Sequence, residues 1–239
     1  MSSIKYQQRI VAVVIFVLVL VMAPMMASAQ SPGQQNLGVS APSPELTAAW
    51  WQWAVSIPAS QSPITDTSGA KCDVGQSGPV WFLVGTTGGD PVTRDCTIPK
   101  KKAILVPIVN AEWSVTEANG GPYVGGTCFV PASPQGTSEE ALRACAIATM
   151  DRVTGATVEV DGVSQSPYRV QSPLFIFKPV PHNVFAIPRG ETQSVADGFW
   201  ILLEPLSVGQ HTIHFHGVAE FPEYEFTLNV EATYNLTIK

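Results

Sequence analysis

FWILLEPLSVGQHTIHFHGVAEFPEYEFTLNVEATYNLTIK, residues 199–239, is the stretch that decides the fold. Over residues 226–238 its apolar and polar side chains alternate strictly, which is the period-two pattern of a half-buried β-strand. The segment at 199–206 is apolar, and the segment at 211–217 carries three of the chain's four histidines. We therefore predict a β meander in which the histidine strand pairs antiparallel with the last strand. The side chains expected to be buried in the last strand are Phe226, Leu228, Val230, Leu236 and Ile238.

Most of the rest of the chain is also predicted to form β-strands, but shorter ones. It contains 20 prolines and 19 glycines, a composition typical of short strands joined by turns. Strands are predicted in the apolar or alternating runs at 80–84, 103–109, 158–163, 168–170 and 174–177. Pro107 cannot donate a ladder hydrogen bond, so it predicts an edge position or a bulge. Loops are expected at 85–95, 110–126 and 179–190.

Two segments show helical periodicity instead. Ser43 and Pro44 form a helix start, followed by apolar residues on one face as far as Ile57. The second helix begins at the capping box of residues 137–140 and runs to about Arg152. The tryptophans of the first helix, Trp50, Trp51 and Trp53, are interpreted as cover for the sheet, and a sugar-stacking platform is the alternative.

The first 29 residues predict an exported protein. Lys5 and Arg9 precede an apolar run that ends in Ala27-Ser-Ala29, the pattern of a signal peptide cleaved after Ala29. Removing 29 of 239 residues leaves 210 and changes the net charge from −6 to −8. We expect a flexible lead-in at 30–43, a single mainly β domain at 44–239, and a secreted or periplasmic location without stable membrane insertion after cleavage. A chain this acidic, without a basic stripe, excludes nucleic acid as a partner.

The four cysteines predict two disulfides, because an even number in an exported chain favours pairing. Three connectivities are open, and we favour the sequential one because it closes the shortest loops. It joins Cys72 to Cys96 and Cys128 to Cys145. The fold class that follows is a disulfide-stabilised antiparallel β-sandwich or jelly roll with two short covering helices.

Several short motifs together resemble a group of secreted microbial proteins of unassigned function. They are Trp50-Trp-Gln-Trp53, Gly78-Pro-Val-Trp-Phe-Leu83, Tyr168-Arg-Val-Gln-Ser-Pro173 and Gly209-Gln-His-Thr-Ile-His-Phe215. The resemblance covers most of the mature chain. It implies export and a compact β-rich domain, and it carries no activity or site residues with it.

The one constellation with metal chemistry is the histidine strand. His214 and His216 leave the same face of a strand with Cα atoms about 6.7 Å apart, so two imidazoles can bind one zinc or copper ion. With Glu220 the string resembles the first metal motif of the cupins, and His182 or His211 would have to complete the site. The alternative is that the pair lies on a wet face, while His211, on the opposite face, is a core histidine bonded to backbone.

Two functional classes remain open from the sequence. One is a metal-binding protein or metalloenzyme that uses His214, His216, Glu220, His182 and His211. The other is a non-catalytic extracellular module that binds a small molecule, a glycan or another protein. Late acidic residues, among them Asp197 and Glu220, also raise the hypothesis of a carboxylate pair for glycoside hydrolysis.

Overall fold

The computed structural model describes residues 37–120, 128, 130–131 and 133–239. The predicted signal peptide, residues 1–29, and the first half of the predicted lead-in lie outside these residues. Part of the lead-in is ordered, however, because strand β1 (Val39–Ser40) pairs with the end of β9. None of the helices within the described ranges has the length and hydropathy of a membrane span.

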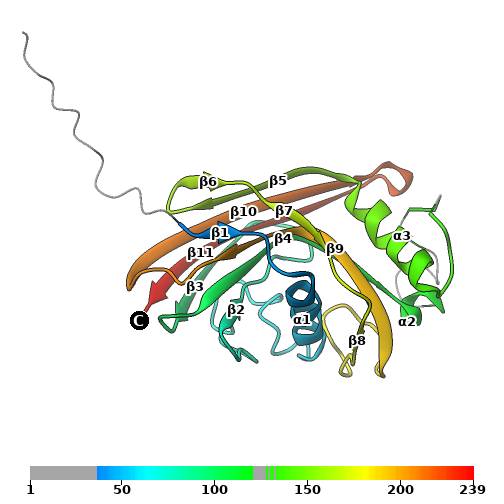
Figure 1. The fold of residues 1–239 in the computed structure, drawn as a ribbon, viewed down its shortest axis with the longest axis horizontal. Coiled ribbons are helices and arrows are strands. Elements are labelled where there is room, and N and C mark those ends of the chain that lie inside the picture. Colours follow the sequence, from blue (N-terminus) through cyan, green and yellow to red (C-terminus); the bar gives the residue numbers. More distant parts are fainter. Residues whose placement is uncertain (1–36, 121–127, 129, 132) are drawn as a thin grey trace, which may run out of the picture. The chain divides into compact units, whose positions relative to one another are not determined.

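The domain is a β-sandwich of two sheets (Figure 1), as predicted. In the first sheet the order is β1, β9 (Thr192–Leu203), β4 (Ala103–Ser114) and β2 (Val80–Phe82), with β7 (Tyr168–Gln171) and β8 (Phe175–Phe177) also paired to β9. In the second sheet the order is β3 (Val92–Ile98), β11 (Phe226–Ile238), β10 (Gly209–Phe221), β5 (Val153–Val160) and β6 (Val163–Gln165). The pairs β2–β4 and β3–β11 are parallel, because the chain crosses between the sheets at each of these steps.

The predicted meander forms the centre of the second sheet. β10 and β11 pair antiparallel from Gly209 opposite Ile238 to Phe221 opposite Phe226, and the 3-10 helix η1 (Pro222–Tyr224) joins them. Of the five side chains expected to be buried, Val230, Leu236 and Ile238 are buried and Leu228 is half-buried. The prediction is wrong for Phe226, which is 50% exposed because the hairpin extends beyond the core.

The main core lies between the two sheets. Most of its residues come from β4, β9, β10 and β11, among them Ile201, Phe215 and Tyr234, and β2 contributes Trp81. The rings of Phe215 and Tyr234 stack at 6.3 Å between centroids. At Gly217 of β10 the sheets approach so closely that a Cβ atom would lie 2.6 Å from the Cβ of Val109. Glycine is therefore required there.

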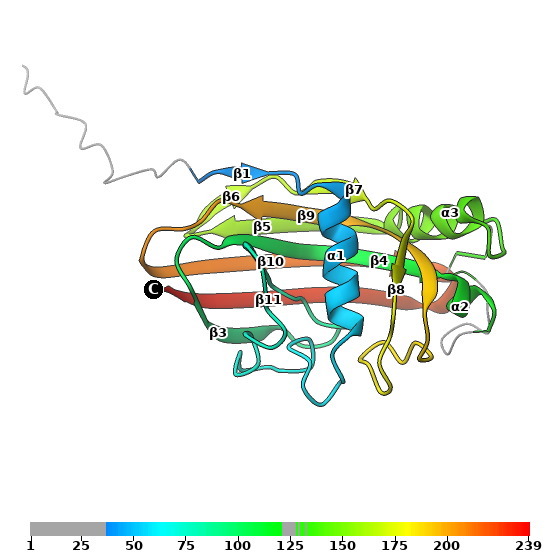
Figure 2. The same ribbon diagram turned by 60° about the horizontal axis from the view of Figure 1, so that its bottom comes forward.

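Within the described residues, three α-helices cover the sandwich, one more than predicted. Helix α1 (Pro44–Val55), capped by the Ser43 side chain, crosses the outer face of the first sheet (Figure 2). Its three tryptophans are buried, which confirms their role as cover for the sheet. Helix α3 (Glu139–Met150) is present where the second helix was predicted, but Ser138, and not Thr137 of the predicted capping box, is the capping residue. The additional helix, α2 (Val115–Ala118), lies in the segment 110–126 that was predicted to be a loop, and β4 also extends into that segment.

Both predicted disulfides are present. Cys72 is bonded to Cys96 of β3, and Cys128 is bonded to Cys145 of α3. The described residues contain no free cysteine. Cys145 is buried on the face of α3 that meets β4 and β9, so this disulfide fixes the preceding loop to the helix.

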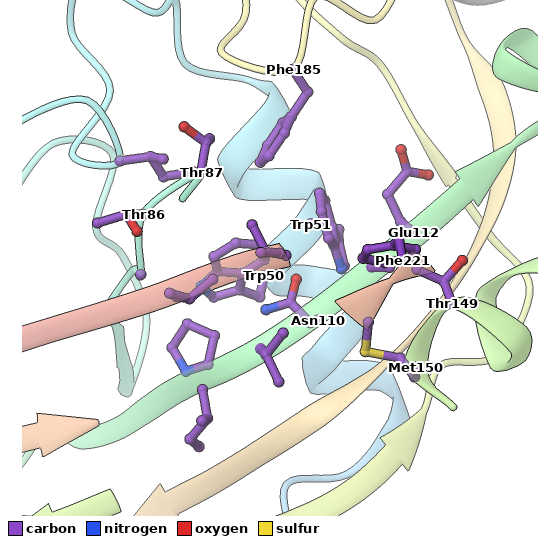
Figure 3. Close-up of a pocket in the computed structure, with 18 of the residues that line it drawn as sticks. Trp50, Trp51, Thr86, Thr87, Asn110, Glu112, Thr149, Met150, Phe185 and Phe221 are labelled. Carbon is purple, nitrogen blue, oxygen red and sulfur yellow. The ribbon is translucent and has the colours of Figure 1, made fainter. Parts of the chain in front are cut away.

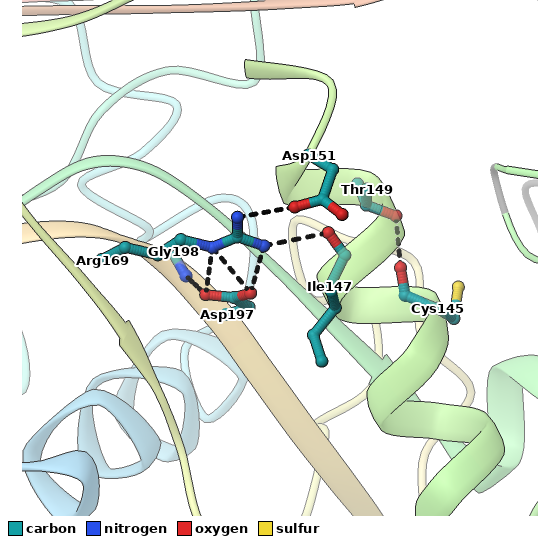
Figure 4. Close-up of polar contacts among 7 residues, drawn as sticks. All are labelled: Cys145, Ile147, Thr149, Asp151, Arg169, Asp197 and Gly198. Atoms are coloured by element: carbon teal, nitrogen blue, oxygen red, sulfur yellow. Dashed lines mark hydrogen bonds and ion pairs between the residues drawn. The ribbon is translucent and has the colours of Figure 1, made fainter. Parts of the chain in front are cut away.

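An arginine cluster holds the end of α3 against the first sheet (Figure 4). Arg169 of β7 donates from Nε and Nη2 to Asp197 of β9, at 3.1 and 2.8 Å from Oδ2. It also donates to Asp151 at the end of α3 (2.6 Å) and to the carbonyl of Ile147 (3.1 Å). Asp197 is buried, and its burial raises its pKa more than Arg169 lowers it. This late carboxylate therefore has a structural partner.

Candidate functional site

The histidine strand does not assemble a metal site among the described residues. His214 and His216 do share a face of β10, but Nε2 of His214 lies 3.1 Å from Oε1 of Glu231 on the neighbouring strand. Glu220 is exposed and accepts a long hydrogen bond of 3.4 Å from Thr154. His182 lies on the loop beside the end of α1, where its carbonyl accepts from the N–H of Ala59. Nowhere in the described ranges do three or more His, Cys, Asp or Glu side chains converge as metal ligands would.

His211 has a structural role, as the core-histidine interpretation predicted. It is 8% exposed, and its Nδ1 lies 2.7 Å from Oδ2 of Asp161 in the β5–β6 turn. Its Nε2 lies 2.9 Å from the carbonyl oxygen of Ser207 in the turn before β10. Asp161 also accepts from the N–H of Thr212 at 2.8 Å. His211 thus fixes two turns at the same end of the second sheet.

The structure instead offers a pocket of about 380 Å³ beside the unpaired edge of β4. β4 pairs with β2 only over Ala103–Leu105, so its edge beyond Leu105 has no strand partner there. Pro107 lies just beyond this limit, and the register with β9 shifts between Pro107 and Val109. Both the edge and the bulge predicted from Pro107 are therefore present. The shift lets Asn110 and Glu112 line the pocket.

The pocket wall is mostly apolar and strongly aromatic (Figure 3). Helix α1 contributes Trp50 and Trp51, and the β10–β11 hairpin contributes Phe221 and Phe226, whose rings stack at 6.0 Å. The other lining residues come from the loops before and after β2, from β4, α3 and β11 and from the loop before β9. They include Ile64, Gly85, Ile108, Met150, Phe185, Leu228 and Val230. An apolar wall of this extent is suited to the body of an organic molecule rather than to a hydrated ion.

A pair of carboxyl groups forms the polar end of the pocket. Glu112 on β4 and Glu117 on α2 share a hydrogen bond, and each has a serine donor. Ser194 Oγ donates to Glu112, and both Oγ and N–H of Ser114 donate to Glu117, the latter at 3.1 Å. Ser114 and Glu117 together form a capping box at the start of α2, which holds Glu117 in place.

The surroundings keep a proton on this pair. Burial raises the pKa of Glu112 well above its usual range, and the neighbouring carboxyl of Glu117 raises it further. Burial also raises the pKa of Glu117, against the lowering effect of the hydrogen bonds from Glu112 and Ser114. Glu112 is half-buried and lines the pocket. We therefore assign the shared proton to Glu112, which donates to Glu117.

Two polar groups near the pair have no partner among the described residues. The indole N–H of Trp51 is buried and has no acceptor. Asn110 lines the pocket, and no hydrogen bond of its side-chain amide is found within the described ranges. Buried donors are normally paired, so an orphan N–H in a ligand-sized pocket needs an explanation.

Arg94 of β3 holds the wall opposite the pair. It is 1% exposed and donates to the backbone carbonyls of Ile64, Val84 and Gly85, at 2.7 Å from Val84. It also donates to the hydroxyl of Tyr234 at 2.9 Å. Both Ile64 and Gly85 line the pocket, so this guanidinium positions the two loops that form that side.

The sequence analysis missed this site, although one signal was present. Ser114-Val-Thr-Glu117 has the spacing of a capping box, which predicts a helix start where we expected a loop. Nothing in the sequence places Glu112 beside Glu117, because that proximity depends on where β4 ends and how α2 turns back. Comparison with known proteins adds no further identification: no family model, no curated protein and no solved structure matches this chain.

Proposed function

We propose that this is an exported binding protein that holds a small, mostly apolar organic molecule in the pocket beside β4. The observation that carries the proposal is the pocket itself. Its volume of about 380 Å³ lies within the range of small-molecule sites, and its wall combines aromatic side chains with a few polar groups at one end. The two disulfides fit an extracytoplasmic location.

The geometry favours a small molecule over the other partner classes. A glycan-binding platform needs exposed aromatic faces and many hydrogen-bonding groups, whereas Trp50 and Trp51 are 3% and 4% exposed. The zinc or copper hypothesis stays a prediction without support from the arrangement of His214 and His216. The pocket is the feature whose size, lining and polar end all point to one kind of ligand.

A fluorescent probe tests the proposal directly. N-phenyl-1-naphthylamine, an uncharged apolar fluorophore at neutral pH, should bind at one saturable site with enhanced emission. Leu228→Trp adds bulk to the half-buried pocket wall and should weaken binding by about 10-fold or more, which corresponds to about 1.4 kcal/mol. Ile176→Trp, at a 50% exposed position of β8 outside the pocket, is the matched control. Absence of saturable binding, or equal binding by the Leu228 variant, would refute the proposal.

A further inference from the structure

The carboxyl pair lacks a cationic partner. No ion pair involves Glu112 or Glu117 in the part of the chain that the structure describes, and their donors there are the neutral groups of Ser114 and Ser194. Among the described residues that line the pocket, Glu112 and Glu117 are also the only titratable ones. With one shared proton, the pair therefore keeps one negative charge without a counter-ion from these surroundings.

An unneutralised charge in an apolar site is expensive, even when it accepts hydrogen bonds. Two neutral serine donors satisfy lone pairs, but they do not replace the hydration that a carboxylate loses on burial. A positive group on a ligand would complete the site, since a cation beside a buried carboxylate forms a charge-assisted hydrogen bond. The missing counter-ion of the carboxyl pair costs more than the one unpaired N–H of Trp51, so it decides which charge the ligand is expected to have.

The aromatic wall favours the same kind of ligand. The rings of Trp51 and Phe185 lie 5.0 Å apart, and those of Phe221 and Phe226 lie 6.0 Å apart, all around one pocket. The faces of aromatic rings attract cations, and they do so more strongly where water is excluded. An organic ammonium ion can therefore present its charge to the carboxyl pair and its CH groups to these rings.

Trp51 gives a second, independent sign that the pocket takes a ligand. Its side chain is 4% exposed, and its N–H has no acceptor within the described residues. Figure 3 shows the ring nitrogen on the side of Asn110 and Phe221, toward the pocket. A donor left unpaired at this position indicates that the pocket takes a ligand, but it does not bear on the ligand's charge, because an ammonium group has no lone pair to accept from it.

We infer that the pocket selects organic cations, namely an alkyl- or arylalkylammonium ion whose charged nitrogen lies at Glu112 and Glu117 and whose apolar body lies against the aromatic wall. This inference rests on the proposed binding function. It adds the charge and the orientation of the ligand, and it can fail while the apolar pocket still binds uncharged molecules.

Three probes of nearly the same shape separate these outcomes. They are 3-phenylpropylamine, 3-phenylpropan-1-ol and 3-phenylpropanoate, each titrated by displacement of the fluorophore at pH 7.5. We expect the amine to bind at least about 10-fold more tightly than the alcohol, with the carboxylate weakest. Equal or tighter binding of the alcohol would overturn the inference and leave the proposed function intact. If neither the fluorophore nor any probe binds, the proposed function itself fails.

The double variant Glu112→Gln/Glu117→Gln removes the charge and keeps amide groups in place of the carboxyl groups. It should lose the preference for the amine while it still binds the alcohol, and Glu159→Gln on the exposed face of β5 is the control for net charge. Because the double variant could fold poorly, the wild-type protein provides a second test. The amine preference should fall as the pH is lowered and the pair takes up a second proton, and a preference that does not change with pH would overturn the inference.

Discussion

Glu112→Gln should stabilise the protein at neutral pH. The glutamine amide has the shape of a protonated carboxyl group, so it can accept from Ser194 and donate to Glu117 as the present side chain does. Unlike the carboxyl group, it does not have to take up a proton when the chain folds. The substitution therefore removes a cost of folding and keeps the hydrogen bonds.

The sign and size of the effect follow from linkage. The pKa of Glu112 is higher in the folded protein than its ordinary value of 4.5, so the native state binds the proton more tightly than the unfolded state. The stabilising contribution of that proton is fully present below the unfolded pKa and is lost as the pH rises through the folded pKa. Each pH unit costs about 1.4 kcal/mol, so the interval from 4.5 to pH 7 limits the gain from glutamine to about 3.4 kcal/mol.

Urea unfolding with the disulfides intact, at pH 4, 5.5, 7 and 8, measures this profile. The free energies of unfolding of the variant and the wild-type protein should be similar at pH 4, and the variant should become more stable by about 1–3 kcal/mol at pH 7–8. The exposed Glu159→Gln should show no such divergence. If the difference between Glu112→Gln and wild type is the same at all four pH values, the shared-proton reasoning is refuted.

Three further predictions concern the rest of the fold. Arg169→Leu should lower the free energy of unfolding by about 3–5 kcal/mol, because it removes the cationic partner of the buried Asp197 and leaves it the N–H of Gly198 as a donor. Removal of the exposed Arg189 should have little effect. His211→Ala should lower the free energy of unfolding by about 1–3 kcal/mol, whereas replacing His214 and His216 together should change it by less than about 1 kcal/mol. If elemental analysis found one metal ion per chain, and this ion were lost in the double variant, the metal hypothesis would be restored. Reduction of both disulfides should lower stability by several kcal/mol, about 3 kcal/mol for each loop, and an unchanged urea midpoint after reduction would contradict this.

The sequence predicted the elements whose signals are local. Residues 226–238 alternate because one face of β11 packs on the core and the other faces outward, so the pattern and the burial agree from Val230 to Ile238. Ser43 caps α1 as its position before Pro44 indicated. The disulfide pairing followed from short loops. Phe226 has the same alternation but is half exposed at the start of β11, and no local pattern marks where a core ends.

The site was not predictable in the same way. Residues 110–114 were expected to belong to a loop because the segment 110–126 contains glycine pairs at 120–121 and 125–126, yet Asn110 and Glu112 are part of β4 and line the pocket. The histidines of β10 drew attention because they are close in sequence. Whether they bind a metal depends on the side chains that neighbouring strands place beside them, and the neighbour of His214 on β11 is Glu231.

Stability and specificity are linked at the carboxyl pair. An amphipathic pocket without Glu112 would be more stable at neutral pH, as the glutamine variant tests, but it would have less reason to prefer a charged ligand. Burying the negative charge of the pair lowers the stability of the unliganded protein. A cation that neutralises this charge removes that cost when it binds, and its affinity is higher by the same free energy. The two experiments are therefore coupled. If the pair is costly at neutral pH, as its burial and mutual repulsion indicate, an ammonium ligand should raise the stability of the wild-type protein more than the uncharged alcohol does.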